Sequence, residues 1–225
     1  MTEPAETRPA RFNPMRLPVA QAYAFWTAAT AVAVVFCYYV VDLPLARAVQ
    51  PLRDTAVRDI AERLTQLGDF QWYVVPALLA GLIALPFRRD IMNRALYLTV
   101  AMLAGGISVQ LLKRLFGRAR PSRLWSEDIY GFFPFNGSGS YFSFPSGHTT
   151  VFFCAWMAFG MIWPRWRALF FVIAFCGAFT RVLVEMHFFG DLLGGALLGT
   201  ACAHLTARAW PRPVEWAAAR DTAAT

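Results

Sequence analysis

The sequence predicts an all-α fold: a polytopic membrane protein with six transmembrane helices and an amphipathic interfacial helix. Of the 225 residues, 57% are hydrophobic and only 16% are charged, which is too apolar for an ordinary soluble domain. Long apolar segments recur along the chain, and arginines gather in some of the links between them but not in others. That uneven distribution is typical of a protein with a fixed orientation in a membrane.

The apolar segments have the lengths expected of membrane spans, each near the roughly 20 residues that cross a bilayer. The first is too long for a signal-peptide core and lacks a clear cleavage site, so we expect it to be retained. We predict one membrane domain over 20–209, between cytoplasmic tails at 1–19 and 210–225. The predicted spans are 20–41, 70–87, 92–115, 147–163, 168–186 and 190–209.

The segment 52–67 differs from the spans because charged residues alternate with apolar ones at helical spacing. This pattern predicts an amphipathic helix on the outer surface. Two roles stay open, a packing helix that covers the bundle and a helix that gates substrate. The apolar positions are Leu52, Ala56, Ile60, Leu64 and Leu67.

Arginine placement predicts the orientation of the chain. Arginines precede the first span, occupy two of the links and follow the last span, and the positive-inside rule makes that side cytoplasmic. Both termini then lie inside, and we expect a bacterial inner membrane protein whose other links are periplasmic. The outer stretch QLLKRLFGRARPSR (110–123) breaks this bias with five cations, among them Lys113, the only lysine in the chain. Charge placed against the topology rule indicates a functional site.

Several classes of protein and site are disfavoured. The four cysteines lie inside apolar segments without CxxC spacing, so we expect small buried hydrophobes rather than disulfides or metal ligands. The sequence has no His/Cys cluster, and we predict neither a metal nor another cofactor. The net charge of +7 fits topology and anionic lipid headgroups better than nucleic acid. The cysteines are Cys37, Cys154, Cys176 and Cys202.

Three polar clusters fall at the ends of spans that the topology places on the outer side. Lys113 and Arg120 would share a face if their helix persisted, although Pro121 favours a turn at Arg120 instead. Arginine offers a planar fork for phosphate oxygens, and lysine a compact point charge. The clusters are Lys113 with Arg120-Pro121, then Pro145-Ser146-Gly147-His148, then Thr180-Arg181 with His187 and Asp191.

The second and third clusters favour anion binding and nucleophilic catalysis. The free N–H groups at a helix start beside Gly147, with the Ser146 hydroxyl, would form a phosphate cradle. His187 and Asp191 are four residues apart, so on a helix the carboxylate would hold the imidazole in one tautomer. Such a pair suits a nucleophilic histidine.

Other residues have simpler interpretations. We expect His204 in the core, and the glycines of the last span in close helix packing. Glu127 and Asp128 are expected to pair with nearby arginines rather than to touch a substrate headgroup. Headgroup contacts or surface charge are the roles expected of Arg114, Arg118 and Arg123.

The three clusters together resemble the type 2 phosphatidic acid phosphatase superfamily of integral membrane lipid phosphatases. Its signature K-x6-R-P, P-S-G-H and S-R-x5-H-x3-D is similar to KRLFGRARP, PSGH and TRVLVEMHFFGD in this sequence. Thr180 replaces the usual serine and keeps its hydroxyl. Glu185 lies one turn after Arg181 and is expected to neutralise it in part.

The resemblance implies a role for each matching residue. His187 would be the nucleophile that forms a phosphohistidine, Asp191 would orient it, and His148 would act as general acid. No metal is implied, because cations can stabilise the transferred phosphoryl group. The phosphate-binding residues would be Lys113, Arg120, Ser146, Gly147 and Arg181.

The function implied by this resemblance is a metal-independent lipid phosphatase. Its substrate would be a lipid phosphate or diphosphate of the undecaprenyl diphosphate, phosphatidylglycerophosphate, phosphatidic acid or lipid A 1-phosphate type. One alternative is a phosphotransferase that passes the phosphoryl group to a lipid acceptor. A non-enzymatic anion transporter would not need the histidine pair. Headgroup selectivity is expected in 122–144 and 42–69, and the oligomeric state stays open.

Overall fold

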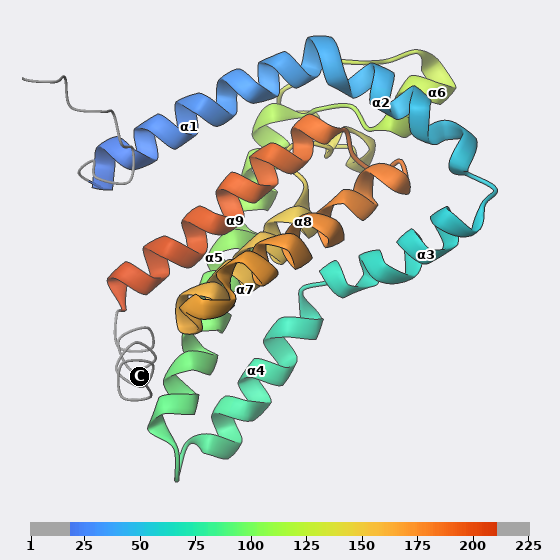
Figure 1. The fold of residues 1–225 in the computed structure, drawn as a ribbon. Coiled ribbons are helices and arrows are strands. Elements are labelled where there is room, and N and C mark those ends of the chain that lie inside the picture. Colours follow the sequence, from blue (N-terminus) through green and yellow to red (C-terminus); the bar gives the residue numbers. More distant parts are fainter. Residues whose placement is uncertain (1–18, 211–225) are drawn as a thin grey trace, which may run out of the picture.

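The computed structural model describes residues 19–210, whose regular elements are all helices (Figure 1). This confirms the predicted all-α membrane fold. Four helical segments are long and apolar enough to cross a bilayer, and Gly147–Ile162 is a shorter apolar helix. The four are Val19–Leu52, Ala56–Ala84, Arg89–Phe116 and Pro164–Leu183. The count of six spans stays a prediction, and the predicted tails lie outside the described residues except for Val19 and Trp210.

The first helical segment is longer than the predicted span. Helix α1 (Val19–Phe36) continues through a π-helical turn at Cys37–Val41 into α2 (Asp42–Val49). Such π-helical turns are rare and occur often at functional sites. This one carries the chain to Asp42, whose side chain is fully buried.

The predicted amphipathic segment contains α3 (Ala56–Thr65), followed by a 3₁₀ turn and α4 (Gln71–Ala84). Helix α3 packs near α8, with Ala61 and Thr65 buried. Its apolar stripe faces away from the protein, since Ile60 is 57% and Leu64 47% exposed. That orientation is expected of a helix at a membrane surface.

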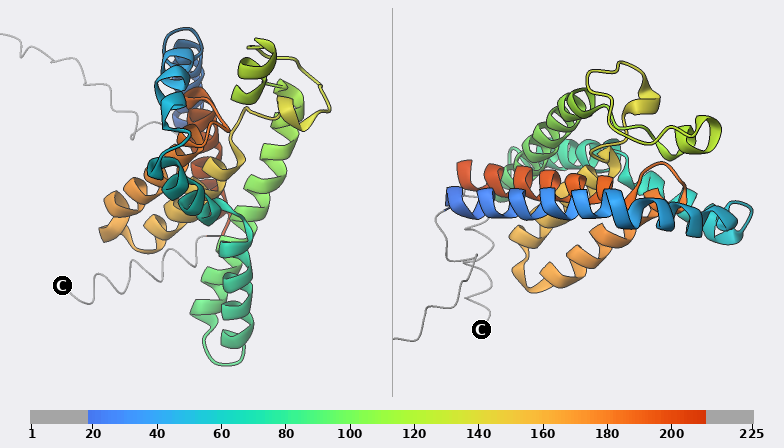
Figure 2. Two further views of the ribbon diagram at one scale, coloured as in Figure 1. Left: turned by 90° about the vertical axis from the view of Figure 1, so that its right-hand side faces the viewer. Right: turned by 90° about the horizontal axis from the view of Figure 1, so that it is seen from above.

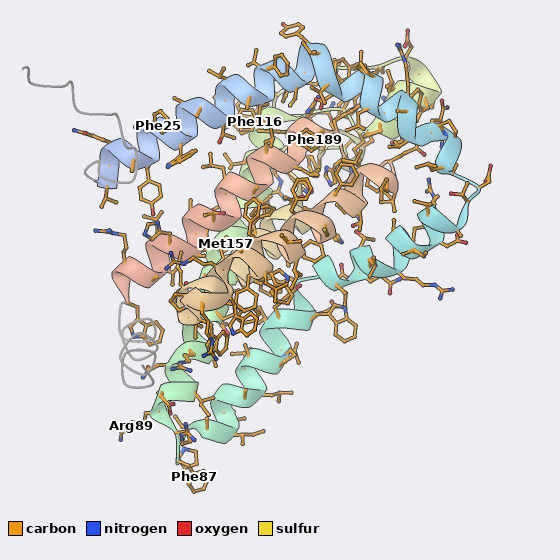
Figure 3. All side chains as sticks on the ribbon, viewed as in Figure 1. Phe25, Phe87, Arg89, Phe116, Met157 and Phe189 are labelled. Carbon is orange, nitrogen blue, oxygen red and sulfur yellow. The ribbon has the colours of Figure 1, made fainter. Side chains whose placement is uncertain are left out.

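Helices α4 and α5 (Arg89–Phe116) form a hairpin that projects from the bundle (Figures 1 and 2). Phe87 and Arg89 mark its tip, where Phe87 points outward and is 82% exposed (Figure 3). At the other end, Gly117 terminates α5 in the left-handed conformation, with φ of +57°. A Cβ atom there would lie 1.8 Å from the Phe133 carbonyl oxygen, so glycine is required. Arg120 therefore lies beyond the helix, as the alternative based on Pro121 predicts.

After α6 (Pro121–Glu127), the chain forms the helices α7 (Gly147–Ile162), α8 (Arg167–Leu183) and α9 (Phe189–Ala209). Helix α7 packs against α5, α8 and α9, and α1 lies beside α9 (Figure 2). The approach of α7 and α9 depends on glycine. A Cβ atom on Gly195 would lie 2.6 Å from the Ser146 carbonyl oxygen, and one on Gly199 would lie 2.4 Å from that of Thr150. These contacts confirm the predicted packing role.

Two interpretations of apolar segments are wrong in part. Cys176 is exposed, whereas the other three cysteines are buried and free. His204 is also exposed, with its ring centroid 5.8 Å from that of Tyr23. An apolar stretch of a membrane helix faces both protein and lipid, so its sequence alone does not predict burial in the protein core.

Candidate active site

The three sequence clusters meet in one cavity of about 690 Å³ at one end of the bundle. Helix α5 ends there, α7 begins, and the α8–α9 link passes the same point. The convergence predicted from the topology is therefore present in the structure. The polar wall includes Asp69, Lys113, Arg120, Gly147, His148, Arg181 and His187.

Three cations of this wall have no ion-pair partner within residues 19–210. Lys113 is only 8% exposed and lies beside Gly147, where an added Cβ atom would be 3.3 Å from its Nζ. Arg181 is equally buried, and its Nη1 donates to Thr65 Oγ1 at 2.9 Å. Arg120 is half-buried and lines the same wall. Charge removed from water without compensation is costly, so we define Lys113, Arg120 and Arg181 as the pocket cations and expect them to bind an anion.

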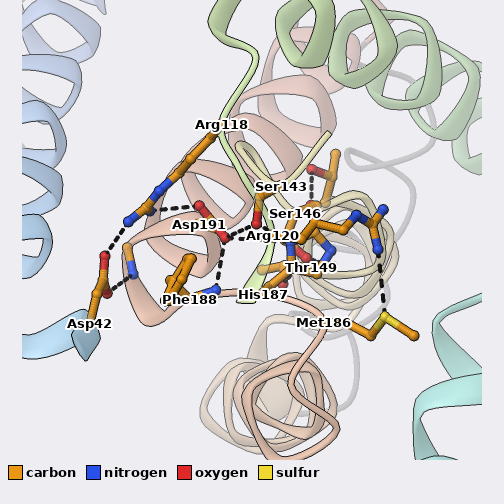
Figure 4. A network of polar contacts seen from close by, with 12 residues as sticks. Asp42, Arg118, Arg120, Ser143, Ser146, Thr149, Met186, His187, Phe188 and Asp191 are labelled. Carbon is orange, nitrogen blue, oxygen red and sulfur yellow. Dashed lines mark hydrogen bonds and ion pairs between the residues drawn. The ribbon is translucent and has the colours of Figure 1, made fainter. Parts of the chain in front are cut away.

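Arg120 lies in extended backbone immediately before α6. Its Nε donates to the Gly139 carbonyl at 3.1 Å, and its Nη1 lies 3.5 Å from Met186 Sδ (Figure 4). Burial lowers the pKa of Arg120, an effect that Asp191 opposes. Within residues 19–210, this half-buried guanidinium faces no carboxylate at contact distance.

His187 and Asp191 are adjacent, although not as two members of one helix. His187 precedes α9, while Asp191 lies in its first turn. His187 Nδ1 is 3.5 Å from Asp191 Oδ2, and that oxygen also accepts from Ser143 Oγ at 2.6 Å and from the Phe188 N–H at 2.8 Å. Burial lowers the pKa of His187 to about 3, despite the hydrogen bond with Asp191. The imidazole is therefore neutral near pH 7.

The PSGH segment starts α7 as predicted, but Ser146 is not among the residues that line the cavity. Its Oγ accepts from Thr149 Oγ1 at 2.9 Å and from the Thr149 N–H at 3.4 Å, and the residue is fully buried. Ser146 therefore serves as a helix cap, whereas Gly147 and His148 line the cavity.

Asp69 was not singled out in the sequence. It follows the 3₁₀ turn Gln66–Gly68, and its Oδ1 lies 3.2 Å from His148 Nε2. A carboxylate at that distance can orient an imidazole. In the sequence, Asp69 is a single acid between an amphipathic segment and a predicted span, and no motif around it indicates this role.

Arg118 is not a surface or headgroup charge, and that interpretation is wrong. Its side chain is 0% exposed and forms ion pairs with Asp42 at 2.6 Å and Asp191 at 2.7 Å. The chain folds back over this segment, because Ala119 donates to the Gly131 carbonyl and Ser143 to the carbonyl of Arg118. The two carboxylates lie 76 and 73 residues away in sequence. Sequence patterns, which relate nearby residues, therefore did not predict these ion pairs.

Glu185 also differs from expectation. It pairs with Arg53 and Arg58 rather than with Arg181. Arg181 thus keeps its full charge toward the cavity. Arg123 does pair with Glu127, as predicted for that acid.

Comparison with known proteins gives one family. The model of the PAP2 superfamily matches residues 94–215. A lipid A 1-phosphatase of Rhizobium etli is 32% identical over 184 residues, covering 76% of this chain and 78% of the relative. A lipid A 1-phosphatase of Rhizobium johnstonii is 31% identical over 193 residues, covering 80% and 78%.

Solved structures share the fold. The crystal structure of Aquifex aeolicus LpxE matches with a TM-score of 0.58 and 24% identity, covering 75% of this chain and 96% of that one. A transmembrane PAP2 type phosphatidylglycerolphosphate phosphatase from Bacillus subtilis gives a TM-score of 0.58 and 20% identity, covering 82% and 93%. The family match spans more than half of the chain, so this membrane lipid phosphatase belongs to the PAP2 superfamily.

Proposed function

We propose that this enzyme removes the 1-phosphate of a lipid A-type glycolipid at the outer face of the inner membrane, through a phosphohistidine. The observation that carries the proposal is the cavity that places the pocket cations beside a neutral histidine. The rhizobial relatives named as lipid A 1-phosphatases support this choice of substrate. The arginine distribution supports the outer face.

The pocket cations suit a phosphate dianion. Lys113, Arg120 and Arg181 come from three separate segments and lack carboxylate partners within the described chain. A phosphoryl group supplies the missing negative charge and accepts several hydrogen bonds at once. The same cations stabilise the charge on the equatorial oxygens during transfer.

The rest of the cavity wall suits a lipid. Below the cations, the wall continues along α5 through Leu103, Ile107 and Leu111. These side chains are 47%, 63% and 61% exposed on the outside of the bundle. A lipid can therefore place its phosphate among the cations while its acyl chains follow α5 in the bilayer.

The geometry supports a two-step reaction. Nδ1 of His187 faces Asp191, so Nε2 is free to attack phosphorus. The Nε2–P bond forms as the P–O bond to the lipid breaks, and His148 donates its proton to the leaving oxygen. His148 then takes a proton from water as the oxygen of that water attacks the phosphohistidine. Inorganic phosphate leaves, and both histidines return to their starting states.

Asp69 supports His148 in this role. A general acid must hold a proton before the lipid oxygen leaves. The Asp69 carboxylate, 3.2 Å from His148 Nε2, orients the ring that must deliver this proton. We therefore assign Asp69 as a positioning residue for the general acid.

The proposal is tested with detergent-purified enzyme and a panel of four lipids, with free phosphate as the readout. The panel contains lipid A 1-phosphate, phosphatidylglycerophosphate, phosphatidic acid and undecaprenyl diphosphate. We expect the highest kcat/KM for lipid A, with activity retained in excess EDTA. An equal or higher kcat/KM for another lipid would overturn the proposal that lipid A is the substrate. Product that appears only with an added lipid acceptor would indicate the phosphotransferase alternative.

A further inference from the structure

A buried ion cluster lies directly behind the proposed nucleophile. Arg118 donates through Nη1 to Asp191 Oδ1 at 2.7 Å and through Nη2 to Asp42 Oδ2 at 2.6 Å (Figure 4). All three side chains are 0% exposed. They come from α2, the link after α5, and α9, so the cluster joins three parts of the chain.

Aromatic rings isolate this cluster from water. The guanidinium carbon of Arg118 lies 4.8 to 5.5 Å from four ring centroids, close enough for cation–π attraction. Burial alone would lower the pKa of Arg118, but Asp191 and Asp42 raise it above its ordinary value. The guanidinium therefore stays charged. The rings belong to Tyr38, Tyr130, Phe132 and Phe188.

Asp42 also fixes the start of α9. Its Oδ1 accepts from the Gly190 N–H at 2.9 Å, while its Oδ2 binds Arg118. Asp42 directly follows the π-helical turn Cys37–Val41, and its carboxylate lies at the start of α9. We define Asp42 and Arg118 as the clamp.

The clamp determines which oxygen of Asp191 faces the nucleophile. Arg118 occupies Oδ1, so Oδ2 is left for Ser143, the Phe188 N–H and His187 Nδ1. This arrangement favours the tautomer with hydrogen on Nδ1 and a free electron pair on Nε2.

The clamp also sets the charge beside His187. Two buried carboxylates and one guanidinium leave a single negative charge behind the imidazole. Without the guanidinium, two negative charges would lie behind the imidazole. The imidazole is the stronger base of the group, so an added proton would go to His187. The charged or titratable groups on its other sides are Lys113, Arg114, Arg120, His148 and Arg181 in the cavity, Asp69 beyond His148, and Glu185, held by Arg53 and Arg58.

We propose that Arg118 and Asp42 are positioning residues that keep His187 neutral and correctly oriented, by compensating one of two buried carboxylates. The inference rests on the proposed role of His187 as nucleophile. A protonated imidazole has no electron pair with which to attack phosphorus, so the clamp acts on the acid limb of the pH–rate profile. A merely structural tie would affect folding and overall rate without moving that limb.

Three variants test the charge count. Arg118→Gln leaves two carboxylates uncompensated, whereas Asp42→Asn removes one of them. The double variant Arg118→Gln/Asp42→Asn restores a single negative charge and can keep amide hydrogen bonds between positions 42, 118 and 191. Arg88→Gln, which breaks an exposed pair with Asp90, is the matched control.

Two readouts separate this inference from the proposed function. The chain has only three histidines, so NMR of ¹⁵N-histidine-labelled enzyme in detergent follows each ring, with His187→Gln assigning its signal. The same variants give kcat/KM against pH on one lipid phosphate. The NMR titration tests the clamp even if His187 is not the nucleophile.

We expect Arg118→Gln to raise the titration midpoint of His187, and the acid limb with it, by about one pH unit or more. In the double variant, the His187 midpoint should return most of the way to the wild-type value. Asp42→Asn and Arg88→Gln should show no upward shift of that midpoint. Unshifted His187 titration in a folded Arg118→Gln would overturn the inference. If that variant does not fold, an upward shift in Asp42→Asn, or one of a full pH unit or more in the double variant, would overturn it. A shift in the NMR titration without one in the rate profile would instead contradict the proposed nucleophile.

Discussion

Arg118 and Arg120 are two residues apart in sequence, yet they lie in regions with opposite charge balance. Arg118 is completely buried and binds two carboxylates. Arg120 lines the cavity beside Lys113 and Arg181, and none of these three has an ion-pair partner among residues 19–210. The clamp is satisfied within the protein, whereas the pocket cations need a ligand. Residue type alone therefore does not separate a structural cation from a binding one.

The two regions meet at His187, so its replacement should have the largest effect. We predict that His187→Gln lowers kcat by a factor on the order of 10⁴ or more, because it removes the atom that bonds to phosphorus. Thermal unfolding should change little. Phosphate release and acid-labile incorporation of labelled phosphate are the measurements, and retention of either signal at wild-type level would refute the mechanism.

Breaking the clamp should mainly lower the free energy of unfolding. Arg118→Ala leaves two buried carboxylates without a cation, and loss of one partner from a buried pair typically costs about 3–5 kcal/mol. The free energy of unfolding in detergent is the measurement. If Arg118→Ala lowered the free energy of unfolding by less than the exposed-pair variant Arg88→Gln, the clamp would not stabilise the fold.

Removing a pocket cation should instead reduce activity while changing the stability of the fold little. Lys113→Ala and Arg120→Ala should each reduce kcat/KM by about 10²–10³, or roughly 3–4 kcal/mol of transition-state stabilisation. Lys113→Arg should also be impaired if the site requires a compact ammonium group. Kinetics and thermal unfolding of the same samples test the contrast, which would fail if these variants lost stability as Arg118→Ala does.

Asp69 should have an intermediate effect. Asp69→Asn leaves His148 in place but removes the carboxylate that orients it, so we expect roughly a 10-fold to 10²-fold loss of kcat, at the lower end of general acid contributions. A substrate with a nitrophenol leaving group needs little protonation and should show a smaller loss. Equal losses on both substrates would argue against a role through the general acid.

The smallest effect is expected for a cation that belongs to neither region. Arg123 forms a partly exposed pair with Glu127 on α6, and such pairs contribute about 1 kcal/mol or less. We therefore predict nearly unchanged kcat/KM and stability for Arg123→Gln. A loss comparable to that of Arg120→Ala would extend the binding site to α6.

The sequence alone determined the membrane class and most of the polar residues that meet in the cavity. Apolar segments of bilayer length predict the helices, because backbone groups in lipid must be satisfied within a helix. Motif spacing at the ends of those helices then predicted that Lys113, His148 and His187 would converge, as they do. Both inferences depend on local sequence and on a constraint imposed by the membrane.

Only the tertiary structure separated Arg118 from Arg120 and brought Asp69 to His148. Each of these outcomes depends on a partner or an orientation that the chain reaches by folding, such as Asp42, 76 residues before Arg118. His204 shows the same limit for apolar segments, because it faces outward from a helix whose sequence is apolar all round. Periodicity cannot tell a lipid-facing side from a protein-facing one when both surroundings are apolar.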